Sequence, residues 1–223
     1  MYQNIPTKVR TGEVRLSYVH LNQPYANQNQ PGSAPKYSVT MLIPKSDTRT
    51  KQDIDQSIMA AYEAAVKDKW QGARPQLRNK LIYDGDGVRN DGTPFGEECK
   101  GHWVITASSP ATRKPQVVHQ SNVGAELDPQ DIYSGMYAQV TINFFSFNTA
   151  GNRGVGCGLG NVMKTRDGEP LGGGASAASD FADMKQGNAT PNYGAAMPAT
   201  PGEAGFQNTG VTPQINPITG LPM

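Results

Sequence analysis

The sequence predicts a mainly β protein, a small antiparallel barrel with one helix, followed by a disordered tail. Short stretches that alternate apolar and polar residues, the pattern of half-buried strands, recur from about residue 13 to residue 163. One segment, 47–70, instead repeats its apolar residues every three or four positions, as an amphipathic helix does. From residue 172 onward neither pattern is present, and Gly, Ala, Pro, Asn and Thr dominate. We therefore expect one folded domain at 1–171 and a low-complexity tail at 172–223 that buries too little apolar surface to become ordered.

The first two strands are predicted at 13–21 and 37–43, and we expect them to pair. A long loop rich in proline and amide side chains separates them. In the first strand Tyr18 falls on the same side as Val14 and Leu16, which predicts that its ring lies in the core. The core is also the expected location of Tyr37, Tyr83, Phe95 and Trp103. The alternative for each of the five aromatic residues is a platform on which bases stack.

A helix is predicted next, with Ser46 or Asp47 as its N-cap and an end near Trp70. The residues of its apolar stripe are Ile54, Ile58, Ala61, Tyr62 and Ala65. We expect this stripe to lie on the barrel. Short strands follow at about 81–83, 102–107 and 115–118.

The strand predicted at 135–148 has two different faces. One is an apolar stripe of Met136, Ala138, Val140, Ile142 and Phe144. The other mixes aromatic, amide and hydroxyl side chains, namely Tyr137, Gln139, Thr141, Asn143, Phe145 and Phe147. If this second face is exposed, its rings can stack on unpaired bases while its polar groups bond sugar and phosphate. The alternative is a second core layer.

The last predicted strand, 153–163, has glycine at every second position from Gly154 to Gly160. Such a bare face permits tight coiling or the close approach of other groups. Five or more antiparallel strands with one helix make an oligonucleotide-binding barrel the first candidate fold and a β-sandwich the second.

The charge distribution gives a mild indication of a polyanionic ligand. The net charge is +1; the tail holds three acidic residues and one lysine, a balance of −2, which leaves +3 for the body. The cations that we expect on a phosphate backbone are Arg15, Lys36, Arg113, Lys114 and Arg153. Two cysteines make a disulfide framework unexpected, and the chain has neither the apolar core of a signal peptide nor a membrane-spanning stretch. We therefore expect a protein of the cytoplasm that does not bind membranes.

An acidic loop, DGDGVRNDG, resembles a calcium-binding loop but fails its spacing. Counted from Asp84, the fifth and sixth positions hold Val88 and Arg89, where calcium loops need an oxygen ligand and glycine. A looser group leaves a magnesium-dependent nuclease open as an alternative: Asp84, Asp86, Glu97 and Glu98. A zinc set is weakly suggested by Cys99, His102, His119 and Cys157. Because these signals are weak, we expect no metal and no cofactor.

The ordered motifs FGEECKGHWVITASS, PQVV, DIYSGMYAQVTINFFSFN, NRGVGCGLGNV and GEPLGG precede a low-complexity stretch with Asp180 and Phe181. In this order, over about 5–182, the chain resembles a family of phage and prophage single-stranded-DNA-binding proteins. The resemblance implies an oligonucleotide-binding barrel that coats single-stranded DNA in phage replication or recombination, in the host cytoplasm and without catalysis. It also implies an acidic tail that recruits partner proteins, from which this weakly acidic tail departs.

Together these observations predict a DNA-binding surface on the strand at 135–148. The residues expected to stack on bases are Tyr137, Phe145 and Phe147, and those expected on phosphates are Arg15, Lys36, Arg113, Lys114 and Arg153. Homo-oligomers on DNA and replication or recombination partners at the tail are further expectations. The alternatives are the nuclease at the acidic loop and a β-sandwich structural protein of the virion.

Overall fold

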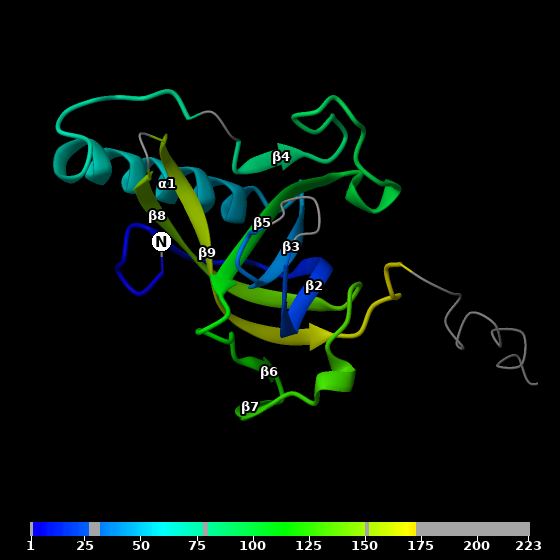
Figure 1. Cartoon of the computed structure of the whole chain (residues 1–223). Helices are drawn as coiled ribbons and strands as arrows, with labels where there is room; N and C mark the ends of the chain where they lie inside the picture. The colour runs from blue at the N-terminus through cyan, green and yellow to red at the C-terminus, as the bar shows by residue number, and fades with distance from the viewer. Residues whose placement is uncertain (1, 27–31, 78–79, 150–151, 173–223) are drawn as a thin grey trace, which may run out of the picture. The chain divides into compact units, whose positions relative to one another are not determined.

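The computed structural model describes residues 2–26, 32–77, 80–149 and 152–172 (Figure 1). Its strands are β1 (Lys8–Arg10), β2 (Val14–Tyr25), β3 (Lys36–Pro44), β4 (Ile82–Asp84), β5 (His102–Pro110), β6 (Val117–His119), β7 (Asn122–Glu126), β8 (Tyr137–Thr149) and β9 (Asn152–Arg166). The helix is α1 (Thr48–Asp68), and two short 3-10 turns are η1 (Glu97–Cys99) and η2 (Pro129–Asp131). The tail predicted at 172–223 lies, except for Gly172, outside the described residues.

Five strands close into a ring in the order β8, β2, β3, β5, β9 and back to β8. Four of these contacts are antiparallel, but β5 and β9 run parallel where Ser108 pairs with Gly158. A ring with an odd number of strands cannot alternate direction all the way round, so one parallel contact is required. The expected barrel with one helix is therefore confirmed, and the parallel contact between β5 and β9 is the one departure from antiparallel pairing in the ring.

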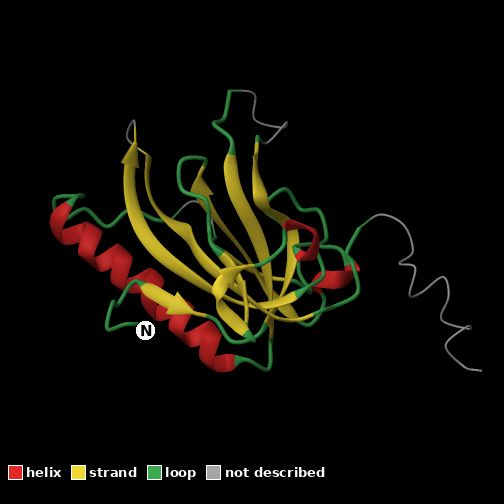
Figure 2. Ribbon diagram, turned by 90° about the horizontal axis from the view of Figure 1, so that it is seen from below, coloured by secondary structure: helices red, strands yellow, loops and turns green. Residues whose placement is uncertain are grey.

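The helix α1 closes one side of the barrel, where it packs against β1, β8 and β9 (Figure 2). Asp47 caps it, because its carboxylate accepts the backbone N–H of Thr50 at 3.0 Å. Three residues of the predicted stripe are buried, Ile54, Ala61 and Ala65, and the other two are partly buried against the same core. The helix predicted from apolar periodicity is thus confirmed in its cap, its extent and its inward face.

The two faces of β8 are assigned correctly by the sequence. Every residue of the apolar stripe, from Met136 to Phe144, is at most 1% exposed. On the other face Phe145 is 47% exposed and Phe147 is 37% exposed. The alternative, a second core layer that contains these two rings, is therefore wrong.

The predicted location of Tyr18 in the core is also wrong, because its side chain is 62% exposed. The pairing of β2 with β3 shifts register between Ser17 and His20, which marks a β-bulge. An extra residue in one strand moves the following side chains to the other face, so Leu21 becomes the next buried residue of the strand. Strict alternation, as read from the sequence, cannot show such a shift.

The sequence gives no clear indication of β1 or β7. β1 contains only three residues, too few for a period, and β7 is exposed along its whole length and therefore has no apolar face. β1 is nevertheless important for the site, because it lies beside β8 and pairs Lys8 with Asn143.

Candidate nucleic-acid interface

A groove of about 540 Å³ lies over β8 and β9 beside the link that connects β5 to β6. We call it the first groove. Its lining includes Lys8, Arg113, Lys114, Thr141, Asn143 and Phe145. It therefore combines an aromatic ring, three cations and polar groups in one depression, which is the composition of sites that bind single-stranded nucleic acid.

Glycines of β9 allow the two exposed rings of β8 to lie across the backbone. Phe145 is opposite Gly156 and Phe147 is opposite Gly154 in the antiparallel register. A Cβ atom on Gly156 would lie 2.7 Å from Cζ of Phe145, and one on Gly154 would lie 2.5 Å from Cζ of Phe147. A side chain at either glycine would force the facing ring to move, so the alternating glycines of the sequence and the aromatic face of β8 form one structural unit.

The helix end holds the part of β8 that carries these rings. Beyond the stretch paired with β1, the carbonyl oxygen of Ser146 accepts a hydrogen bond from Lys69 Nζ at 3.0 Å, and that of Phe147 accepts one from Trp70 Nε1 at 3.3 Å. Trp70 is fully buried. The hairpin of β8 and β9 is therefore anchored to α1. It carries Arg153 near its tip, opposite Asn148.

The predicted cations Arg113 and Lys114 lie at the rim of the first groove. Both are exposed, and Lys114 Nζ lies 3.7 Å from the carboxylate of Glu126. The hydroxyl of Ser109 donates to the carbonyl of Arg113 at 3.0 Å, which fixes the link. Lys8 was missed by the sequence interpretation, although it is one of seven basic residues among the first 51, which include only two acidic ones.

Arg15 and Tyr137 lie apart from the first groove, at the start of β8. The guanidinium carbon of Arg166 is 3.4 Å from the centroid of the Tyr137 ring, and that of Arg15 is 5.9 Å away. Arg166 also pairs with Glu13 at 2.9 Å, and the pKa of Glu13 is lowered by hydrogen bonds from Thr165 and then from Arg166. One face of the Tyr137 ring is therefore already covered by a cation.

Lys36 lies in a second groove of about 610 Å³ over β2, β3 and β5. Its lining includes the hydroxyl residues Ser38, Thr40, Thr106 and Ser108. Because Ser108 is the residue that pairs with Gly158 of the first groove, the two grooves meet at the parallel contact between β5 and β9. Of the eight predicted residues, the first groove and its hairpin bring five together: Arg113, Lys114, Phe145, Phe147 and Arg153.

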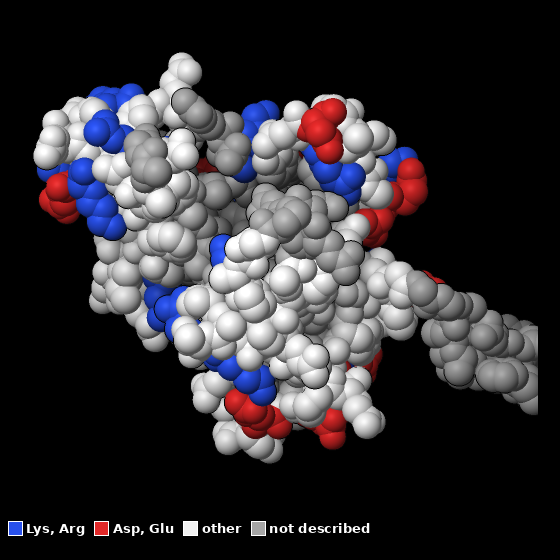
Figure 3. Space-filling view, viewed as in Figure 1, with Lys and Arg blue, Asp and Glu red and all other residues white. Residues whose placement is uncertain are grey.

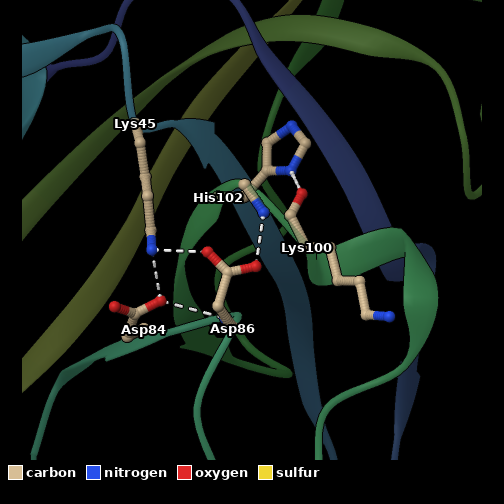
Figure 4. Close-up of polar contacts among 6 residues, drawn as sticks. Lys45, Asp84, Asp86, Lys100 and His102 are labelled. Carbon is tan, nitrogen blue, oxygen red and sulfur yellow. Dashed lines mark hydrogen bonds and ion pairs between the residues drawn. The ribbon is translucent and has the colours of Figure 1, made fainter.

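The acidic loop is held by a lysine and does not form a metal site. Lys45 Nζ lies 2.6 Å from carboxylate oxygens of both Asp84 and Asp86, and Asp86 also accepts the N–H of Gly101 at 2.9 Å (Figure 4). The hydrogen bond from Lys45 is the main reason why the pKa of each aspartate is lowered. Glu97 pairs with Lys100 instead. Three of the four carboxylates of the nuclease alternative are therefore already paired with lysines, which argues against a magnesium site there.

The cysteine and histidine residues weighed as zinc ligands do not come together. Cys99 packs with Leu42 and Val104, whereas Cys157 is part of the main core. Burial raises the pKa of the Cys99 thiol to about 11 and that of Cys157 to about 12, so neither is a thiolate near neutral pH. Within the described residues, no three His, Cys, Asp or Glu side chains form a group that could hold a metal ion.

Charged side chains are unevenly distributed on the face seen in Figure 3. Basic side chains form an interrupted row from the end of α1 at the upper left to the β6–β7 hairpin at the bottom, while most acidic ones lie around the connection between β4 and β5 and at that hairpin. Such a row can follow a phosphate backbone. Among the described helices, none has the length and apolar character needed to cross a membrane.

The chain matches a family model described as the ssDNA-binding protein of Enterobacter phage Enc34 over residues 7–190. A structure of the bacteriophage Enc34 protein in complex with ssDNA is 29% identical, with a TM-score of 0.61 over 74% of this chain and 90% of that chain. A C-terminal truncation of that protein is 28% identical, with a TM-score of 0.58 over 74% and 88%. The ssDNA-binding protein gp2.5 of bacteriophage T7 is 20% identical, with a TM-score of 0.51 over 85% and 98%, which supports the fold alone. No curated protein sequence matches.

The fold and the comparisons exclude the sandwich alternative. β8 pairs with both β2 and β9, so the sheet closes on itself instead of forming two separate layers. The family model covers more than half of the chain. The chain therefore belongs to the Enc34 family of phage single-stranded-DNA-binding proteins, which bind DNA without catalysing a reaction.

Proposed function

We propose that this protein coats single-stranded DNA, with little sequence preference, during phage replication or recombination. The observation that carries the proposal is the pair of half-exposed rings, Phe145 and Phe147, laid on the glycines of β9 beside Arg113 and Lys114. Every base has a flat face, so stacking on such rings tolerates any sequence. A relative has been solved in complex with ssDNA, which supports the same ligand here.

In this proposal the rings stack on bases while cations contact phosphates. In the first groove the phosphates are contacted by Lys8, Arg113 and Lys114. At the hairpin tip they are contacted by Arg153. Lys36 contacts the strand in the second groove. Arg15 lies beyond the first groove, and Tyr137 offers only the ring face that Arg166 leaves open. Homo-oligomers on DNA and recruitment of replication or recombination proteins through 172–223 are parts of the same proposal.

A titration of labelled single-stranded and duplex oligonucleotides at several salt concentrations, read by fluorescence anisotropy, tests the proposal. Single strands should bind far more tightly than duplex, with a log–log salt slope of about −0.7 for each phosphate neutralised. Replacing both Arg113 and Lys114 by alanine should reduce the magnitude of that slope by about 1.4. Lys100→Ala is a matched control, because this lysine pairs with Glu97 and lies outside both grooves. Equal affinity for duplex, or binding that salt does not change, would refute the proposal.

A further inference from the structure

Tyr18 combines an unusual backbone conformation with high exposure. Its backbone φ is 47°, in the left-handed region that bulky residues rarely adopt. The residue lies in the bulge of β2 and is 62% exposed. The bulge is held from outside the strand, because Ser134 Oγ accepts the N–H of Val19 at 3.1 Å. Strained residues that the surrounding structure holds in place are concentrated at ligand sites.

The bulge directs Tyr18 into the second groove, where two further rings are present. His20 and Tyr25 stack on each other with centroids 4.5 Å apart and planes 11° from parallel. Tyr25 is itself 43% exposed. Lys36 supplies a cation, and the hydroxyls of Thr40 and Thr106 lie 2.9 Å apart on the groove surface. Rings, a cation and hydroxyl groups are the chemistry that holds bases and the sugar-phosphate backbone of an unpaired strand.

We propose that Tyr18, with the His20–Tyr25 pair, forms a second base-stacking site for single-stranded DNA. The site rests on the proposed function, because it takes the same ligand as the first groove. The grooves adjoin where Ser108 pairs with Gly158, so one strand can pass from one to the other across the parallel contact. The DNA path then includes β2, β3, β5, β9 and β8 in their order around the barrel.

Tyr18→Gly tests this site, because it separates loss of the ring from loss of stability. Glycine adopts positive φ readily, so the variant should melt at or above the wild-type temperature. Its affinity for an oligothymidylate of about 16 nucleotides should nevertheless fall about 5- to 150-fold, the range for one lost stack. Tyr18→Phe keeps the ring and should bind like the wild type.

Oligonucleotide length tests the continuity of the two grooves. Oligonucleotide-binding folds occupy about 4 to 16 nucleotides, so the gain in affinity from a 4-mer to a 16-mer should shrink in Tyr18→Gly. A wild-type affinity of Tyr18→Gly for the 16-mer, together with weakened binding by Phe145→Ala, would overturn the second site and leave the proposed function intact. If the wild-type protein does not prefer single strands to duplex, the second site and the proposed function are both refuted.

Discussion

Two adjacent phenylalanines of β8 should have opposite effects when each is replaced by alanine. Phe144 is 1% exposed in the core, so Phe144→Ala leaves a cavity and should lower the free energy of unfolding by about 3–5 kcal/mol. For a domain of this size, that corresponds to a melting temperature lower by roughly 6–20 °C. Phe145 is 47% exposed and lies over Gly156, so Phe145→Ala should lower the free energy of unfolding by less than about 1 kcal/mol.

The effect on DNA binding should be reversed. Loss of one stacked base costs about 1–3 kcal/mol, so Phe145→Ala should weaken binding of single strands about 5- to 150-fold. Phe144→Ala should bind nearly as well as the wild type at temperatures where it remains folded. Phe145→Tyr keeps a ring in the groove and is the matched control.

Circular dichroism melts and anisotropy titrations on the same preparations measure both quantities. If Phe145→Ala proves to be the unstable variant and Phe144→Ala the benign one, the two faces of β8 have been assigned in reverse. If Phe145→Ala folds normally and binds with wild-type affinity, stacking on this ring does not contribute to binding.

The remaining predictions concern the glycine positions, the acidic loop and the tail. Gly156→Val should displace the Phe145 ring and weaken both folding and DNA binding, whereas unchanged binding would show that the ring position is not critical. EDTA should change neither affinity nor melting temperature, and magnesium-dependent nicking that is lost in Asp84→Asn would revive the nuclease. The hydrogen bond from Lys45 lowers the pKa of Asp86 below its ordinary value of 3.8. The stabilisation of the folded protein by ionised Asp86 is therefore complete above that pH and is lost as the pH falls through the lowered pKa. The difference in melting temperature between the wild type and Asp86→Asn should therefore shrink as the pH falls below about 4, and a difference that stays constant down to the lowest pH at which both proteins fold would contradict this. Truncation after Gly173 should leave the barrel folded and affinity unchanged or slightly tighter, as binding curves and amide exchange can establish; a collapse of affinity would show that the tail belongs to the binding unit.

The sequence by itself determined the features that depend on local periodicity. The cap at Asp47 and the inward face of α1 follow from residues three or four positions apart. The exposure of Phe145 and the burial of Phe144 follow from alternation within one strand. These predictions succeeded because the geometry of a helix or strand fixes which side chains share a face, whatever its neighbours are.

Only the tertiary structure decided which strands meet and in which register. Alternation placed Tyr18 in the core, but the bulge in β2 exposes it. Arg15 and Tyr137 were grouped with Phe145 by charge and strand face, yet they lie apart at the start of β8. The pairing of Phe145 with Gly156, and the parallel contact that joins the two grooves, arise from hydrogen bonds between strands distant in sequence. Such contacts depend on how the ring of five strands closes, and local periodicity carries no information about that closure.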